Sequence, residues 1–392
     1  MGNIIDYIQW RGDITMEKSG FNNVDALIFT QLAYVPFPKC MFDRFDDGIT
    51  IGEAADIFFE KNELTEEEKK TTLMTNTLRI LAEMQHSKRF SGLKLIDYAE
   101  KYDVESTLQF GAVTVRIDRN TYFVAFRGTD DTITGWEEDF RLCYMTPVKA
   151  QIEAVRYLKD VCGRHYGKVY VGGHSKGGNL SVYSVMKQGK RIRGRVKAIY
   201  NFDGPGFLES VANSREYTDV LEKVRTYMPQ NSVVGMIMYQ KDDYTVVHST
   251  NKGFMQHVVL SWELVGTEFI TEPELSESSI IFNEACKKWV NEISPKDREQ
   301  FIGTVFQVLR ANNADTISDF TENIPASINA SIKSFAGLDK TTKRMVKSVV
   351  MQIIRLATRT INEEKKSRIE EKKNKNDGRS ELKRRQAQTH KP

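Results

Sequence analysis

Two observations predict an α/β protein with a mostly parallel central sheet. Short apolar runs, KVYVGG, VKAIYNF and VVGMIMYQ, recur in the middle of the chain and are separated by helical patterns and loops. Runs of about four to eight apolar residues that alternate with helices are typical of strands buried on both faces. The first run also leads directly into a glycine-rich turn and a helical pattern, which makes a strand–turn–helix unit.

The first part of the chain is helical in pattern. Residues 24–35 (VDALIFTQLAYV) predict a buried helix, and residues 50–60 and 65–85 predict two more. We expect residues 1–105 to form a helical segment that packs on the core or covers it.

Strand patterns begin near Phe110. The run FGAVTVRI alternates apolar and polar residues, and TYFVAF returns after an Arg-Asn turn, so the two predict a hairpin. Apolar residues at helical spacing over 149–162, and a helix near 177–188, complete the pattern of a core over residues 106–270.

The C-terminal part divides into a helical region and a basic tail. Residues 271–361 are helical in pattern, whereas residues 362–392 have few core-forming side chains and are expected to be disordered or a solvated helix. The tail holds eleven Lys or Arg against six Asp or Glu, which gives it a net charge of +5. Because the whole chain has a net charge of +3, residues 1–361 carry −2.

The composition excludes several classes of site. The four cysteines form no Cys-x-x-Cys pair or Cys/His cluster, which argues against a zinc site and against a disulfide framework: Cys40, Cys143, Cys162 and Cys286. The N-terminus has no signal-peptide pattern, and no run approaches 18 apolar residues. We expect a cytoplasmic protein that needs no metal or organic cofactor.

The strongest chemical signal is GGHSKGGN, which contains Gly-x-Ser-x-Gly at Gly173, Ser175 and Gly177. A strand precedes it and a helix follows it, which is the context of a nucleophile elbow. There the serine is held in a strained turn, and the helix N-terminus offers unpaired N–H groups to a developing oxyanion. The motif does not end in Gly-Lys-Ser/Thr, so it is not a phosphate-binding P-loop.

A second motif, FRGTD, ends the strand TYFVAF and is followed by GWEED. A hydrolase of this type needs a second oxyanion donor from the loop after an upstream strand, and Thr129 lies in the right place in chain order. Taken alone, this segment is better explained as a polar loop in which Arg127 pairs with a nearby carboxylate.

The two motifs together resemble the class 3 (fungal-type) lipases, and especially an uncharacterised bacterial branch of that superfamily. The fragments WRGD, FRGTDDTITGWEEDF, GGHSKGGN, NFDGPGF and DDYTVVHS carry this resemblance along most of residues 1–310. The resemblance implies an α/β-hydrolase fold, an ester-hydrolase type of reaction and Ser175 as nucleophile. It also implies oxyanion donors at Thr129 and at the backbone N–H of Lys176. It identifies no substrate.

The triad base must follow the nucleophile and the acid in chain order. We favour His257 over His248, because it lies in a loop before an apparent apolar strand, from which it could reach the elbow; His390 lies in the polar tail. A solvated or packed histidine is the alternative reading. His165 and His174 precede the nucleophile and are expected to be structural.

For the acid we favour Asp243, because it follows the apparent strand VVGMIMYQ. Asp242 is the second choice, and Asp203 in NFDGPGF is the third.

Two features depart from the lipase pattern. The histidine follows Asp243 by only fourteen residues, and Lys176 stands where lipases commonly carry an apolar side chain. A cation beside the elbow would suit a polar or anionic substrate better than a long acyl chain.

The sequence therefore predicts a serine hydrolase that cleaves a small-molecule or lipid-like carboxylic ester or thioester through an acyl-enzyme. The alternative is a catalytically silent hydrolase fold that binds a membrane or a partner. Residues 343–361 form a basic amphipathic pattern, which could make weak peripheral contact with an anionic membrane. Such a stripe more often packs on the protein's own core. The tail has no aromatic interleaving, so we expect no specific nucleic-acid binding.

Overall fold

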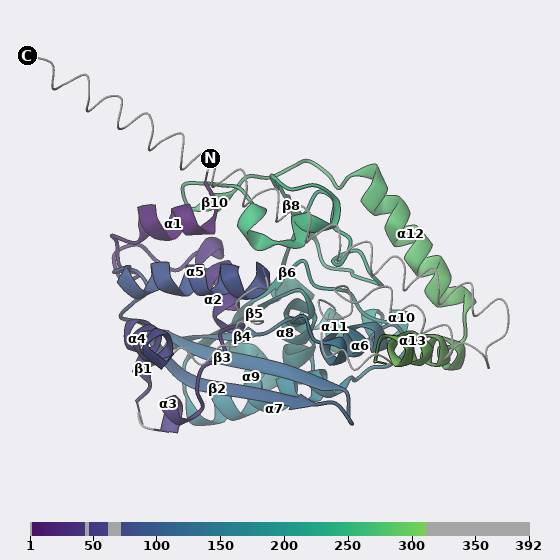
Figure 1. The fold of residues 1–392 in the computed structure, drawn as a ribbon, viewed down its shortest axis with the longest axis horizontal. Coiled ribbons are helices and arrows are strands. Elements are labelled where there is room, and N and C mark those ends of the chain that lie inside the picture. Colours follow the sequence, from purple (N-terminus) through teal and green to yellow (C-terminus); the bar gives the residue numbers. More distant parts are fainter. Residues whose placement is uncertain (1, 44–46, 62–71, 311–392) are drawn as a thin grey trace, which may run out of the picture. The chain divides into compact units, whose positions relative to one another are not determined.

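The computed structural model describes residues 2–43, 47–61 and 72–310. The chain divides into two compact units, Met1–Gln307 and Val308–Pro392. The elements below belong to the first unit, apart from the last turn of its final helix. An eight-stranded sheet lies at the centre of this unit, with its strands in sequence order (Figure 1). The strands are β1 (Ile49–Thr50), β2 (Lys94–Asp103), β3 (Leu108–Asp118), β4 (Thr121–Phe126), β5 (Lys168–His174), β6 (Val196–Phe202), β7 (Val224–Pro229) and β8 (Tyr244–Val247).

The sheet has an antiparallel half and a parallel half. Strands β1 to β4 pair antiparallel, and β3 and β4 form the predicted hairpin with Ala112 opposite Phe126. Strands β4 to β8 pair parallel, and β5 and β6 are two of the three apolar runs from which a mostly parallel sheet was predicted. Because carboxyl ends of parallel strands share one edge, the residues that follow β5 and β6 lie next to each other.

Helices cover both faces of the sheet. They are α1 (Ile4–Arg11), α2 (Asn23–Leu32), α3 (Cys40–Asp43), α4 (Ile51–Lys61), α5 (Thr72–His86), α6 (Ile133–Arg141), α7 (Lys149–Arg164), α8 (Lys176–Met186), α9 (Lys190–Arg195), α10 (Glu209–Ala212), α11 (Arg215–Thr218), α12 (Glu277–Glu292) and α13 (Pro295–Arg310). Three short 3₁₀ helices and a two-stranded hairpin complete the described part: η2 (Leu221–Lys223), η3 (Gly253–His257), η4 (Val259–Ser261), β9 (Leu264–Val265) and β10 (Glu268–Phe269).

Alternate residues of the central strands feed two separate cores. On β4, Phe123 packs with the N-terminal helices α1, α2, α4 and α5, whereas Val124 packs with α7 and α8 on the other face. Both residues are fully buried. This two-residue alternation is what makes the run TYFVAF apolar throughout. Figure 1 shows α2 and α5 on one side of the sheet and α7 on the other.

A buried ion pair joins the N-terminal helices. Asp25 and Arg89 have fully buried side chains, and Arg89 Nε donates to Asp25 Oδ1 at 2.8 Å. Arg89 also donates to the backbone carbonyls of Ser19 at 2.8 Å and Gly20 at 2.9 Å. Asp25 is at the same time the third residue of the capping box that Asn22 begins at α2. The pair therefore fixes the start of α2 against the segment after α5.

The structure corrects three predicted elements. Strand β2 lies within residues 1–105, which we expected to be helical; β1 pairs with only its first residues, so the outer end of β2 is an exposed edge with a polar sequence. The run VVGMIMYQ is not a strand, because residues 233–240 form turns whose Met236 and Met238 pack inward. The segment after His257 is a 3₁₀ helix rather than a strand.

Helix α12 rests on the loop of residues 230–240. The Ser276 N–H before the helix donates to Gln230 O at 2.7 Å. Further along, Asn291 Nδ2 donates to Tyr239 Oη at 2.8 Å. Residues 311–392, which include the predicted amphipathic helix and the basic tail, lie outside the described residues. No described helix is long and apolar enough to cross a membrane.

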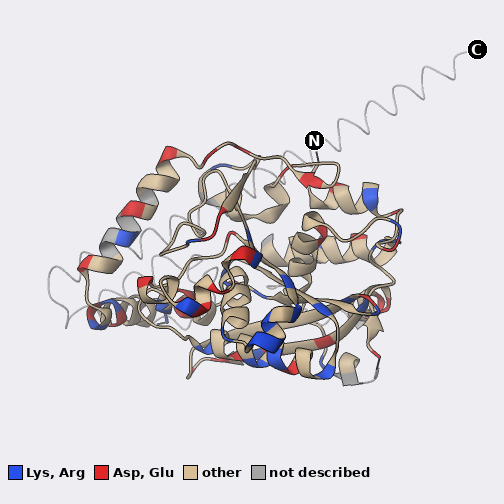
Figure 2. Cartoon of the chain, turned by 180° about the vertical axis from the view of Figure 1, so that it is seen from behind, with Lys and Arg blue, Asp and Glu red and all other residues tan. Residues whose placement is uncertain are grey.

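Basic side chains gather at the edge of the sheet opposite to the elbow. Helix α9, of sequence KRIRGR, leads into the amino end of β6, whereas Ser175 follows the carboxyl end of β5. Figure 2 shows the Lys and Arg residues of this region on the face turned away in Figure 1. Within this region the guanidinium group of Arg195 is bound to the protein itself, because it donates to the backbone carbonyls of Cys162 and Gly167 near the end of α7.

Candidate active site

Ser175 occupies a strained turn between β5 and α8. Its backbone has φ 59° and ψ −134°, a conformation that side-chain-bearing residues rarely adopt. The flanking glycines make the turn possible: a Cβ on Gly173 would lie 2.1 Å from the Gly177 carbonyl carbon, and a Cβ on Gly177 would lie 2.2 Å from Phe126 O. The turn has the geometry of the predicted nucleophile elbow.

Lys176 begins α8, so its backbone N–H belongs to the first turn, whose donors have no acceptor within the helix. Its side chain is completely buried and points away from solvent. The ammonium group donates to Gln109 O at 3.0 Å, to Gln109 Oε1 at 2.6 Å and to Glu138 Oε2 at 3.0 Å. The sequence suggested that this cation would favour an anionic substrate. That interpretation is wrong, because Glu138 neutralises the charge and the amino group's donors are occupied.

His257 pairs with Asp203, not with Asp243. His257 Nδ1 lies 2.6 Å from Asp203 Oδ2, and the Asp203 side chain is fully buried while that of His257 is 17% exposed. The other oxygen of Asp203 accepts hydrogen bonds from Ser232 Oγ and, at 3.1 Å, from the Gly235 N–H. Since a carboxylate only accepts, His257 Nδ1 carries the proton and donates to it. The loop of residues 230–240 thus holds the carboxylate that orients the histidine.

Backbone bonds bring Ser175 to this pair. The Ser175 N–H donates to Phe202 O at 2.9 Å, and Phe202 is the last residue of β6 directly before Asp203. His257 in turn stacks on His174, the residue before Ser175, with ring centroids 4.4 Å apart. Ser175, Asp203 and His257 therefore converge at the carboxyl edge of the parallel strands.

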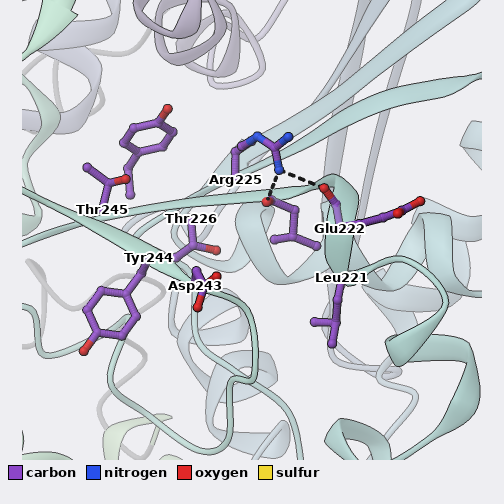
Figure 3. A pocket seen from close by; sticks show the side chains of 9 residues that line it. Leu221, Glu222, Arg225, Thr226, Asp243, Tyr244 and Thr245 are labelled. Carbon is purple, nitrogen blue, oxygen red and sulfur yellow. Dashed lines mark hydrogen bonds between the residues drawn. The ribbon is translucent and has the colours of Figure 1, made fainter.

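The two carboxylates that the sequence favoured lie elsewhere. Asp242 accepts hydrogen bonds from the hydroxyls of Tyr217 and Thr226. Asp243 is exposed and lines a surface cavity of about 250 Å³ beside Thr226 and Tyr244 (Figure 3). The prediction failed because residues 233–240 were interpreted as the strand before the acid. The strand that precedes this loop is β7, and the carboxylate that contacts His257 follows β6.

His248, the second choice for the base, is engaged by two glutamates. Its Nδ1 lies 2.5 Å from Glu272 Oε1 and its Nε2 lies 3.2 Å from Glu263 Oε2. Both ring nitrogens are therefore committed to carboxylates outside the site. His165, expected to be structural, contacts Asp97 at 3.0 Å.

The loop after β4 lies directly against the elbow. A Cβ on Gly128 would lie 3.0 Å from Ser175 Cβ and 2.5 Å from His174 O, so only glycine allows this approach. The next residue, Thr129, is half-buried, and its hydroxyl donates to Asp139 Oδ2. Thr129 thus stands beside Ser175, where the sequence predicted an oxyanion donor.

Asp139 has an unusual environment. Burial raises the pKa of its carboxyl to about 6, and Lys176, 3.9 Å away, and the Thr129 hydroxyl oppose that rise. The carboxylate therefore titrates near neutral pH beside the loop that carries Thr129. The sequence did not single out this residue within GWEED.

Sequence reasoning also missed Tyr34. Its hydroxyl lies 3.3 Å from His174 Nδ1 and 3.3 Å from His174 O, and its side chain is 3% exposed. It follows α2, far from the motifs in the sequence, so no local pattern marks it. Among the described residues, no group of three His, Cys, Asp or Glu side chains could hold a metal ion.

A family model described as Mbeg1-like matches residues 84–307, more than half of the chain. No curated protein matches. Among solved structures, M37 lipase is 14% identical, and the match covers 54% of this chain and 68% of that one with a TM-score of 0.33. A Rhizomucor miehei lipase propeptide complex is 15% identical, with coverages of 57% and 67% and a TM-score of 0.34. Lip2 lipase from Yarrowia lipolytica is 10% identical, with coverages of 67% and 89% and a TM-score of 0.35.

Proposed function

The chain belongs to the Mbeg1-like family and has a lipase-like α/β-hydrolase fold, as the sequence predicted, and on this premise we propose that it is a serine hydrolase. Its substrate is a small-molecule or lipid-like carboxylic ester or thioester, which it cleaves through an acyl-enzyme on Ser175. The observation that carries the proposal is the 2.6 Å contact between His257 Nδ1 and Asp203 Oδ2 beside the strained turn of Ser175. A buried carboxylate, a histidine and a serine at an elbow are the parts of a triad.

In this proposal His257 is the general base. Because Nδ1 donates to Asp203, Nε2 is the nitrogen that takes the proton from Ser175 Oγ as the oxygen attacks the ester carbonyl carbon. The imidazolium then returns that proton to the leaving alcohol or thiol as the carbon–oxygen or carbon–sulfur bond breaks. Water repeats the two steps on the acyl-enzyme and releases the acid and Ser175. Asp203 keeps its hydrogen bond from Nδ1 throughout and stabilises the imidazolium.

The oxyanion of the tetrahedral intermediate would be bound by Lys176 N–H and by Thr129. The first donor lies at the positive end of α8. Thr129 offers its backbone N–H, whereas its hydroxyl donates its proton to Asp139. The buried Lys176 side chain takes no part in binding substrate, but it holds the first residue of α8 in place.

The test is covalent labelling by a fluorophosphonate probe together with hydrolysis of p-nitrophenyl esters of graded chain length. We expect Ser175→Ala to abolish labelling and to lower kcat by on the order of 10⁴–10⁶-fold. Ser184→Ala is the matched control, because Ser184 is also buried in α8 and its hydroxyl donates to Ser181 O. A parent protein that is folded but neither labelled nor active would favour the silent scaffold instead.

A second pair of variants tests the acid. Asp203→Asn should lower kcat by on the order of 10⁴-fold, because the amide no longer fixes the correct tautomer of His257. Asp243→Asn should leave kcat unchanged, since Asp243 is exposed at a separate cavity. The opposite ranking would return the acid to the position that the sequence favoured.

A further inference from the structure

His174 is held in one protonation state by its surroundings. Its Nε2 lies 2.9 Å from the backbone oxygen of His257, and a carbonyl oxygen only accepts, so Nε2 carries a proton. Burial, and next the neighbouring His257, hold the pKa of His174 well below its ordinary value, so the ring is neutral at physiological pH. Nδ1 is then the unprotonated nitrogen.

Tyr34 supplies the matching donor. Its hydroxyl lies 3.3 Å from His174 Nδ1 and, as Nδ1 has no proton, only the hydroxyl can donate in this contact; it shares its one proton between Nδ1 and His174 O. The same oxygen lies 3.3 Å from His174 O and against Gly128, where a Cβ would come within 2.3 Å of it. One buried phenol therefore contacts the residue before the nucleophile and the loop beside it.

The neutral ring of His174 is placed to serve His257. It binds the backbone oxygen of His257 and stacks on its imidazole, with centroids 4.4 Å apart and planes 32° apart. Asp203 fixes His257 through its ring, and His174 fixes it through its backbone. A charged His174 would repel the imidazolium that forms on His257 during the reaction, whereas a neutral ring accommodates it.

We propose that Tyr34 and His174 are positioning residues for His257, and that the N-terminal helical segment thereby completes the active site. Tyr34 holds His174 in the Nε2-protonated form, and that proton binds the backbone of His257 at the elbow. The proposal rests on the proposed function, because it assigns the two residues to the base of that triad. It gives the segment of residues 1–105 a role in catalysis beyond covering the core.

Four variants test this proposal through kcat and KM on a soluble p-nitrophenyl ester. His174→Leu should lower kcat by on the order of 10–100-fold with little change in KM, since displacement of a catalytic group acts on the chemical step. His174→Gln should restore most of kcat, because its amide N–H can donate to His257 O. Tyr34→Phe should lower kcat by about 2–10-fold, the worth of one hydrogen bond.

Tyr7→Phe is the matched control for Tyr34→Phe. Tyr7 is a buried tyrosine of the same segment, and its hydroxyl donates to Asp25 at 3.0 Å without contacting the site. It should lower the Tm and leave kcat unchanged. Parent-level kcat in folded His174→Leu, or a loss of kcat in Tyr7→Phe equal to that in Tyr34→Phe, would overturn the proposal.

A spectroscopic measurement keeps this test separate from the proposed function. In ¹⁵N-histidine-labelled full-length protein, long-range ¹H–¹⁵N correlations should show His174 as the neutral Nε2–H form between about pH 6 and 8. Tyr34→Phe should shift the Nδ1 resonance of His174 and the ring resonances of His257. A protonated Nδ1 on His174, or unchanged His257 resonances, contradicts the positioning role. Absence of labelling at Ser175 in the parent contradicts the hydrolase instead.

Discussion

Two fully buried ion pairs, Asp25–Arg89 and Glu138–Lys176, lie in different regions of the molecule. The first joins the N-terminal helices, and none of its partners belongs to the active site. The second lies beneath the elbow, because the backbone of Lys176 supplies a proposed oxyanion donor while its side chain reaches Glu138. Both cations also bind backbone carbonyl groups. A buried ion pair thus stabilises the packing of the N-terminal segment in one region and holds the proposed oxyanion donor in position in the other.

The two pairs also differ in the donor chosen. Arg89 presents a planar fork and contacts both oxygens of Asp25 as well as two backbone carbonyls. Lys176 presents a compact charge with three donors, all directed at Gln109 and Glu138. A fork suits a junction between several segments, whereas an ammonium suits a narrow space under a turn. Removal of either cation leaves a buried carboxyl group without its ion-pair partner, but the two changes should differ in their effects on stability and on kcat.

The largest effect is expected from Arg89→Met. It leaves the buried carboxyl group of Asp25 without its partner and removes the donor that binds the carbonyls of Ser19 and Gly20, so the free energy of unfolding should fall by about 3–5 kcal/mol. Urea unfolding measures the loss. The kcat of the remaining folded enzyme should not change, because the pair is apart from the site.

The double variant Asp25→Asn/Arg89→Met sharpens this result. The neutral amide removes the unpaired charge and keeps one oxygen, which can accept from the Asn22 N–H or the Tyr7 hydroxyl, so part of the lost stability should return. A double variant less stable than Arg89→Met would mean that the charge of Asp25 is not what makes the single change costly.

Lys176→Met should cost less stability and more activity. Glu138 keeps hydrogen bonds from the N–H groups of Gln109 at 3.1 Å and Ala150 at 2.8 Å, so the unfolding free energy should fall by about 2–4 kcal/mol. Because the elbow loses its support, kcat should fall by on the order of 10-fold. Stability loss with parent kcat would make this pair equivalent to the N-terminal one and break the comparison.

The smallest effect concerns Asp139, which borders the second pair at 3.9 Å from Lys176. Its pKa of about 6 in the folded protein lies above the ordinary 3.8, so the folded state binds this proton more tightly than the unfolded state does. This contribution to stability is present at low pH and is lost as pH rises from about 4 to about 6, by roughly 1–2 kcal/mol after allowance for partial exposure.

Asp139→Asn should remove that part of the pH dependence. The difference in unfolding free energy between variant and parent should move in favour of the variant as pH rises through this window, and stay constant above it. Asp243→Asn, at an exposed position, is the control and should reproduce the parent profile. A flat difference for Asp139→Asn would contradict the raised pKa.

Local motifs in the sequence predicted the elbow, the hairpin of β3 and β4, and the parallel strands. Each depends on neighbours along the chain: the glycines around Ser175, or alternation within one strand. His257 was also selected, from the few histidines that follow Ser175, by its position beside an apolar segment. Long-range contacts were not predictable in this way. Asp203, Asp242 and Asp243 each follow an apolar run in the sequence, and the contact that distinguishes them, between Asp203 and His257, joins residues far apart along the chain.

Apolar composition misled the prediction at one place. Residues 233–240 are apolar because Met236 and Met238 pack into the interior, and that need is met by a folded loop as well as by a strand. The burial of the Lys176 side chain could not be predicted either, because its partner Glu138 is distant in the sequence and no local pattern pairs the two residues.

The loop of residues 230–240 contacts both Asp203 and α12. Ser232 and Gly235 donate hydrogen bonds to Asp203, while Gln230 and Tyr239 accept hydrogen bonds from the start and the end of the α12 segment. The loop that holds Asp203 is thus itself held by α12, so a movement of α12 should reach Asp203 through the loop. The Gly235 N–H makes this coupling observable, because it donates directly to Asp203 Oδ1 at 3.1 Å. The rate of hydrogen–deuterium exchange at the Gly235 amide therefore reports how firmly Asp203 is held. Any loosening of α12 should appear as faster exchange of this amide.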